Sequence, residues 1–154
     1  MKYKSQKGFT LIEILLAVAI IAILAGIVIL AVNPQKQLRD ANVAQRKADV
    51  NTILNAVYQY AVDNKGLMPG ANIPTAPTAA MEVCTSAISV TCTGANLADL
   101  SLLIATQTYL TAIPIDPAGN SSNGGGYTIQ KTTNGRISVT APAVGDYLEY
   151  TATK

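Results

Sequence analysis

The chain is 154 residues long, which is enough for one compact domain and a membrane segment. It contains no histidine, so catalytic triads of the Ser-His-Asp kind and zinc sites that use histidine are excluded. The formal charge of +2 falls to −1 when the three lysines of the first eight residues are set aside, which indicates no basic surface for nucleic acid. Composition therefore argues against an enzyme and against a direct nucleic-acid site.

A long apolar stretch lies close to the N-terminus. Residues 14–32 carry no charged or polar side chain and are long enough to cross a bilayer as one helix. Lys2, Lys4 and Lys7 precede this stretch, and a basic head of this kind keeps its end of the chain in the cytoplasm. A secretory signal has a shorter apolar region followed by a small-residue cleavage site, which is missing here. The sequence predicts a single-pass protein of the cytoplasmic membrane with residues 33–154 outside.

Glu13 lies at the start of the apolar stretch. A carboxylate at bilayer depth costs roughly 2.5–3.5 kcal/mol on insertion scales unless it is paired, neutralised or near an interface. Either a charged partner offsets this cost, or the side chain simply reaches the water at the lipid headgroups.

Gly8-Phe9-Thr10-Leu11-Ile12-Glu13 resembles the N-terminal signature of the type IV pilin and pseudopilin family. The resemblance implies that a prepilin peptidase cuts between Gly8 and Phe9 and that the new Phe9 amine is methylated. It also implies that Glu13 pairs with the Phe9 amine of a neighbouring subunit in a filament. Such a pair suits a low dielectric, where opposite charges attract strongly and either charge alone is costly.

The resemblance implies three parts: a leader peptide, residues 1–8; a transmembrane and assembly helix, residues 9–32; and an extracytoplasmic globular domain, residues 33–154. The implied partners are identical subunits in a helical filament, the prepilin peptidase and methyltransferase, an assembly platform, and membrane lipid before assembly. A type IV pilus is the first interpretation, and a pseudopilus of a type II secretion or DNA-uptake machine is the close alternative. An uncleaved, membrane-anchored extracellular binding module is the alternative from another class.

From residue 35 to about residue 64 the pattern becomes amphipathic, with charged residues such as Arg46 largely off the apolar stripe. The stripe comprises Val50, Ile53, Leu54, Val57 and Ala61. We expect one long helix over residues 9–64 with kinks or weak points at Gly26 and Pro34, because glycine weakens a helix and proline removes one of its hydrogen bonds. The outer half of this helix is predicted to pack against the rest of the domain.

Cys84 and Cys92 are the only cysteines. In an extracytoplasmic segment they predict a disulfide that closes a short loop, with two free thiols as the alternative. Residues 71–95 are predicted to be a loop or mixed segment. Asn96 is predicted to cap a shorter helix that ends before Pro114. Its apolar stripe comprises Leu97, Leu100, Leu103, Ile104 and Leu110.

Alternating patterns at residues 127–131 and 137–141 predict two antiparallel strands joined at Asn134-Gly135. A three-residue loop ending at Gly135 aligns Ile129 with Val139, and we prefer it to a two-residue turn that aligns Ile129 with Thr140. Residues 119–126 are predicted to be a loop, and residues 147–151 a third strand. The predicted class is α+β, with a long kinked helix packed on a small antiparallel sheet; the resemblance implies the lollipop shape of pilins.

Residues 115–120, Ile-Asp-Pro-Ala-Gly-Asn, resemble a loop of major pseudopilins, some of which bind calcium just beyond it. Asp116, Asn120 and Asp146 are the candidate ligands. Calcium takes six to eight oxygens and usually several carboxylates, and the sequence offers few acidic residues here. A plain turn is therefore the preferred interpretation, and no cofactor is expected.

Overall fold

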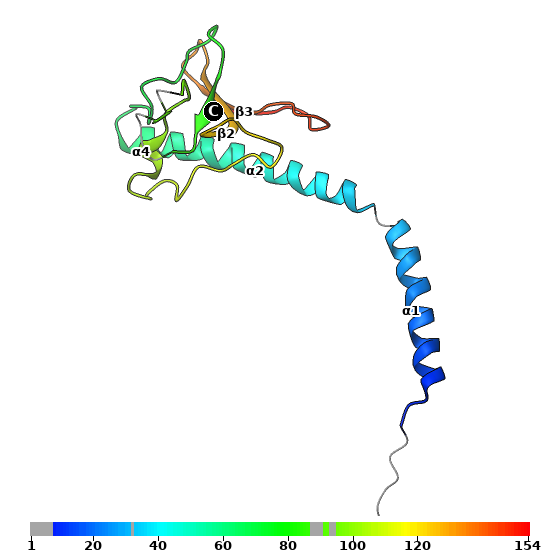
Figure 1. Ribbon diagram of the computed structural model, residues 1–154. Coiled ribbons are helices and arrows are strands. Elements are labelled where there is room, and N and C mark those ends of the chain that lie inside the picture. Colours follow the sequence, from blue (N-terminus) through cyan, green and yellow to red (C-terminus); the bar gives the residue numbers. More distant parts are fainter. Residues whose placement is uncertain (1–7, 32, 87–90, 93–94) are drawn as a thin grey trace, which may run out of the picture. The chain divides into compact units, whose positions relative to one another are not determined.

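The computed structural model describes residues 8–31, 33–86, 91–92 and 95–154 (Figure 1). The chain divides into two compact units, Met1–Leu38 and Arg39–Lys154; the second unit is called the head below. The elements in chain order are α1 (Leu11–Ala31), α2 (Pro34–Asp63), β1 (Met81–Cys84), α4 (Ser101–Ile104), β2 (Gly124–Lys131), β3 (Ile137–Ala141) and β4 (Tyr150–Thr153). The predicted α+β class is confirmed.

The first helix, α1, is apolar on all sides. Its described Leu, Ile and Val side chains are all more than half exposed, from 51% at Ile20 to 78% at Leu11. The helix continues through Gly26, so glycine does not interrupt it. Asn33 lies outside both helices, and its side chain accepts a hydrogen bond from the Lys36 N–H (3.2 Å). Pro34 then takes the first position of α2, where its missing N–H leaves no bond unmade.

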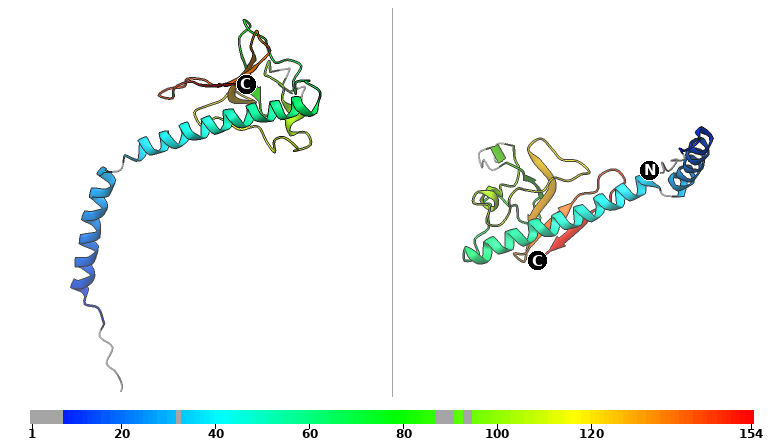
Figure 2. Two further views of the ribbon diagram at one scale, coloured as in Figure 1. Left: turned by 180° about the vertical axis from the view of Figure 1, so that it is seen from behind. Right: turned by 90° about the horizontal axis from the view of Figure 1, so that it is seen from below.

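In the head, α2 lies along one face of a four-stranded antiparallel sheet with the order β1-β2-β3-β4 (Figures 1 and 2). The apolar stripe predicted for this helix is confirmed, since all five of its residues are buried. Alternate residues of β2 and β3 are buried as well, which is the pattern of a sheet with one covered face. The shared core includes Val50, Ile53, Val57, Tyr127, Ile129, Ile137 and Val139.

The hairpin of β2 and β3 has the predicted register. Ile129 lies opposite Val139, and the Thr132 N–H donates to the Arg136 carbonyl (2.7 Å), which closes a three-residue loop. Gly135 has a φ of +82°, a left-handed conformation that glycine adopts without strain. The three-residue loop is therefore confirmed, and the two-residue turn is wrong.

Three strand boundaries differ from the prediction. Residues 81–84, expected within a loop, form β1 and pair with β2, with Met81 opposite Ile129. Residues 124–126, also expected in a loop, belong to β2. The last strand begins at Tyr150, three residues later than predicted. Composition misled the prediction here, because the pairing of these short segments is long-range.

The predicted helix from Asn96 is shortened to the four residues of α4. Asn96 has a φ of +56°, and the Ala98 backbone instead pairs with the edge of β1. The Cys84 N–H donates to the Ala98 carbonyl (3.0 Å), and the Ala98 N–H donates to the Glu82 carbonyl (2.8 Å). These hydrogen bonds replace those that a helix would have made. Leu97, Leu100 and Leu103 are nevertheless buried.

Cys84 and Cys92 form the predicted disulfide, with 5.5 Å between their Cα atoms. Both cysteines are fully buried and form a small cluster with Leu97 beside the main core. The disulfide joins the end of β1 to the segment that follows it.

Candidate functional site

The predicted cleavage site lies just before α1. Gly8 and Phe9 are outside the helix and exposed, with Phe9 80% exposed. No atom of another described part of the chain lies within 4 Å of where a Cβ on Gly8 would be. The peptide bond between these residues is therefore accessible from solvent within this unit.

Thr10 and Glu13 form a capping box at the start of α1. The Glu13 N–H donates to the Thr10 hydroxyl (3.2 Å), and the Thr10 N–H donates to the Glu13 carboxylate (3.5 Å). The Thr10 N–H thus gains an acceptor, while the Glu13 N–H also donates to the Thr10 backbone carbonyl (3.1 Å). The sequence prediction missed this role of Glu13, although the Thr-x-x-Glu pattern indicates it. The capping bonds leave the carboxylate exposed.

Among the helices that the structure describes, one is long and apolar enough to cross a membrane, over Leu11–Ile29. None of that span is buried within the protein. A helix that is apolar all round needs either lipid or other apolar helices around it. This unit can therefore act as a membrane anchor or as a surface for assembly.

A second polar site lies inside the head, where α2 faces the turn before β2. Arg46 donates from Nε to an Asp116 carboxylate oxygen at 2.9 Å. Both side chains are almost completely buried. The second Asp116 oxygen accepts a hydrogen bond from the Ala118 N–H (2.8 Å). A buried pair of this kind loses its hydration, so each partner depends on the other.

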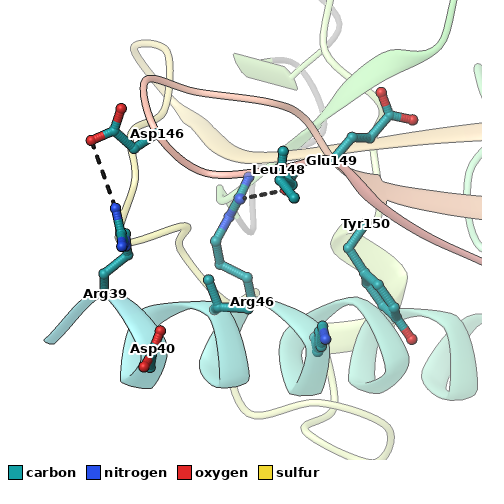
Figure 3. A pocket seen from close by; sticks show the side chains of 9 residues that line it. Arg39, Asp40, Arg46, Asp146, Leu148, Glu149 and Tyr150 are labelled. Carbon is teal, nitrogen blue, oxygen red and sulfur yellow. Dashed lines mark hydrogen bonds and ion pairs between the residues drawn. The ribbon is translucent and has the colours of Figure 1, made fainter. Parts of the chain in front are cut away.

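The remaining donors of Arg46 reach the connection between β3 and β4, residues 142–149, called the β3–β4 loop below. One terminal nitrogen donates to the Leu148 carbonyl (3.3 Å), and the other donates to the Pro142 carbonyl. The guanidinium also lies over the Tyr147 ring, 5.5 Å from its centroid. Figure 3 shows Arg46 rising from α2 toward Leu148. One side chain thus connects three segments that are distant in sequence.

A tyrosine of β2 and an aspartate of α2 form a further polar pair in the head. The Tyr127 hydroxyl donates to the Asp49 carboxylate at 2.7 Å. Burial and this carboxylate raise the pKa of Tyr127 far above its ordinary value. Tyr127 therefore stays protonated at physiological pH and acts as a fixed hydrogen-bond donor in the core.

A carboxylate from β1 holds the segment that leads into β2. Glu82 accepts hydrogen bonds from the N–H groups of Ser121 (3.0 Å) and Gly126 (2.7 Å). Burial raises the pKa of the Glu82 carboxyl, but hydrogen bonds from Ser121 and Gly126 outweigh it, so its pKa is lower than ordinary. Gly126 of this segment is needed for close packing, since a Cβ there would lie 2.3 Å from the Gly119 backbone carbonyl oxygen.

The three candidate calcium ligands each make contacts within the head. Asp116 is bound by Arg46, and Asp146 is exposed and pairs with Arg39 at 4.0 Å. The Asn120 side-chain amide donates to the carbonyls of Ser121 (3.0 Å) and Gly124 (2.9 Å). Over the described part of the chain, no three His, Cys, Asp or Glu side chains gather where they could hold a metal ion. Of the three candidates, Asp116 is thus already paired with the cation of Arg46.

An open cavity of about 560 Å³ lies between α2 and the β3–β4 loop (Figure 3). Its charged lining residues are of both signs: Arg39, Asp40, Arg46, Lys47, Asp146 and Glu149. None of the residues that line it is a serine, cysteine or histidine. The cavity thus offers no Ser-His or Cys-His pair.

Comparison with known proteins identifies the N-terminal segment. Residues 3–29 match the family described as the prokaryotic N-terminal methylation motif. The chain is 41% identical over 66 residues to the type II secretion system core protein G of Pseudomonas aeruginosa, a match that covers 42% of this chain and 44% of that protein. No solved structure gives a significant match. The resemblance to type IV pilins and pseudopilins is confirmed.

Proposed function

We propose that this protein is a filament subunit that is made as a membrane-anchored precursor. A prepilin peptidase cuts it between Gly8 and Phe9, a methyltransferase modifies the new Phe9 amine, and α1 then packs with the α1 helices of identical subunits. The N-terminus faces the cytoplasm before assembly, and the head lies outside. We assign the chain no catalytic role.

The observation that carries this proposal is the exposure of α1. Every large apolar side chain described in this helix is more than half exposed, so its own unit does not cover it. Lipid surrounds it in the stored precursor, and like helices surround it in the filament. Both environments suit a helix that is apolar on all sides.

The presence of Glu13 favours filament assembly over simple membrane anchoring as the function of α1. A carboxylate at this position opposes the insertion of a simple anchor, because a charge at bilayer depth is costly. In a filament, the carboxylate pairs with the Phe9 ammonium of a neighbouring subunit, and the pair sets the register between helices. The capping box supplies a partner for this carboxylate before assembly.

Among the machines that contain such filaments, the similarity to a protein of a type II secretion system favours secretion. The matched relative is named as a core protein of a type II secretion system, so we place a secretion pseudopilus ahead of an adhesive type IV pilus or a DNA-uptake filament. An assembly platform at the cytoplasmic membrane is then the expected partner besides other subunits. The match covers less than half of either protein. The choice of machine is the most specific part of the proposal.

The test is Glu13→Val in the native host, with Glu149→Val as the matched control in the exposed β3–β4 loop. We expect both proteins to accumulate in the membrane. The Glu13 variant should lose at least about tenfold of the subunit recovered in sheared filaments, because a factor of ten needs only about 1.4 kcal/mol of lost pairing energy. The control should assemble normally. Normal assembly of Glu13→Val would contradict the role in assembly that we propose for Glu13, whereas absence of the wild-type protein from sheared filaments would favour the membrane-anchored binding module.

A further inference from the structure

The polar site in the head brings together oxygen atoms of the kinds that bind a hard metal ion in other proteins. Asp116 supplies a carboxylate, and Pro142 and Leu148 supply backbone carbonyls from the β3–β4 loop. Carboxylates and backbone carbonyls are the usual ligands of calcium in proteins. In this chain all three groups accept hydrogen bonds from one guanidinium, that of Arg46.

We propose that Arg46 is a built-in cation that fixes the β3–β4 loop to α2 and to the Asp116 turn, so that the head orders this loop without calcium. The inference concerns the head by itself. It does not depend on cleavage, methylation or filament assembly.

Arginine suits this role better than lysine. Its guanidinium is planar and always charged, and it presents donors in a fixed fork that can serve several acceptors at once. Arg46 uses all three of its nitrogens, on Asp116, Leu148 and Pro142. A lysine ammonium has one nitrogen and would not reach acceptors on both sides of the site.

The β3–β4 loop has little else to hold it in place. The residues from 143 to 149 are exposed except for a half-buried Tyr147, and the Leu148 side chain is 85% exposed. Val144 and Tyr147 exchange backbone hydrogen bonds (3.2 and 2.9 Å), which stiffen the tip of the loop without tying it to the helix. Arg46 therefore supplies the buried attachment of this loop.

Two further contacts join the loop to α2. Asn42 donates from its side-chain amide to the Tyr147 hydroxyl (2.9 Å), and the Arg39–Asp146 pair is exposed with 4.0 Å between charged atoms. Exposed pairs contribute little because water and salt screen them. Arg39 thus provides a matched control: it is the same residue type on the same helix, facing the same loop.

The first experiment uses the full-length protein in detergent and measures its thermal unfolding by circular dichroism, in excess calcium and in excess EGTA. We expect the two midpoints to agree. A calcium ion bound at saturation would raise the midpoint by about 5 °C or more. A calcium-dependent rise of that size would overturn the proposal.

The second experiment measures chymotrypsin cleavage after Tyr147 and Leu148 in the variants Arg46→Lys and Arg39→Lys, under conditions where the uncut protein is folded. The Arg46 variant keeps a positive charge beside Asp116 but loses the fork, so cleavage should accelerate at least about tenfold, the factor produced by about 1.4 kcal/mol in loop opening. The Arg39 variant should be cut at the wild-type rate. Wild-type cleavage of Arg46→Lys would overturn the proposal.

The third experiment is chemical rescue of Arg46→Ala. Truncation leaves Asp116 buried without its partner, and the unfolding midpoint should fall by about 10 °C or more. Low concentrations of guanidinium should restore part of the midpoint and slow the cleavage, whereas the same concentrations of sodium should not. Equal effects of the two cations would contradict a specific guanidinium site. If this variant does not fold, the calcium test and Arg46→Lys decide the question.

Discussion

The two units of this protein differ in whether their apolar side chains are buried. In the head, Ile53 of α2 is completely buried against the sheet, whereas Ile20 of α1 is 51% exposed. Burying an isoleucine side chain contributes about 1.5–3 kcal/mol, so the head gains its stability within one chain. The apolar surface of α1 gains nothing comparable until lipid or another copy covers it. The contrast separates a domain that is complete by itself from a segment that is completed by its surroundings.

The largest predicted effect comes from a matched pair of isoleucine truncations, which tests whether the two units differ in this way. Ile53→Ala removes a fully buried side chain and should lower the free energy of unfolding of the head by about 2–5 kcal/mol. Ile20→Ala should change it by less than about 0.5 kcal/mol. Thermal and urea unfolding of the head in detergent measures both. Similar losses in the two variants would mean that α1 is part of the same folding unit.

Two glycines sharpen the comparison within the head, because they share a backbone conformation but not their surroundings. Gly126 and Gly135 have φ values of +81° and +82°. A Cβ on Gly126 would lie 2.3 Å from the Gly119 carbonyl oxygen, whereas the nearest atom to a Cβ on Gly135 is the end of the Lys131 side chain at 3.9 Å. Gly126→Ala should cost about 2–4 kcal/mol, and Gly135→Ala about 1–2 kcal/mol from backbone strain alone.

The measurement is the shift of the urea midpoint in each glycine variant. Equal shifts would show that backbone strain decides both positions. In that case the close packing of the segment that leads into β2 would not be needed for the stability of the head.

The smallest predicted effect concerns Glu82, whose carboxylate accepts hydrogen bonds from its own chain. Its pKa is lower than ordinary in the folded protein, because the hydrogen bonds from Ser121 and Gly126 outweigh the effect of burial. The stability that it adds is thus fully present above the pKa of the unfolded chain and is lost as the pH falls through the folded pKa. At neutral pH we expect a contribution below about 1 kcal/mol, since water screens a partly exposed group.

The check on Glu82 compares the thermal unfolding midpoints of wild type and Glu82→Gln. The midpoint of wild type minus that of the variant is measured from neutral pH down to pH values below 4.5, the ordinary pKa of the carboxyl. The difference should be positive at neutral pH and shrink on acidification. A difference for Glu82→Gln that stays constant with pH would contradict the assignment.

The parts of the fold that the sequence predicts well depend on local patterns. The helical spacing of Val50, Ile53 and Val57 predicts the packed face of α2, and the position of Gly135 predicts the register of β2 and β3. The close pair Cys84 and Cys92 predicts the disulfide. In each case the residues that determine the structure lie within a few turns or one hairpin of each other.

The parts that it misses depend on distant partners. β1 has four residues in a segment rich in small side chains, and its strand conformation comes from pairing with β2. The stripe from Leu97 to Leu103 is buried as predicted, but its first half follows the edge of β1 instead of a helix. No local pattern in the sequence indicates either pairing.

Arg46 is the clearest case in the candidate site. A charged residue between apolar positions of an amphipathic helix is ordinarily exposed, and the sequence interpretation placed it off the packed face. Its partner Asp116 lies 70 residues away and is buried with it. Glu13, by contrast, is indicated by its own neighbourhood, since both the methylation motif and the Thr-x-x-Glu capping pattern include it.

The central claim is that this chain is a processed filament subunit, and the most direct test is intact-mass and N-terminal peptide analysis of the protein from its native host. We predict a mature chain that begins at Phe9 and carries one added methyl group on its amine. A chain that still begins at Met1 would contradict the claim, and the protein would then be better described as a membrane-anchored binding module.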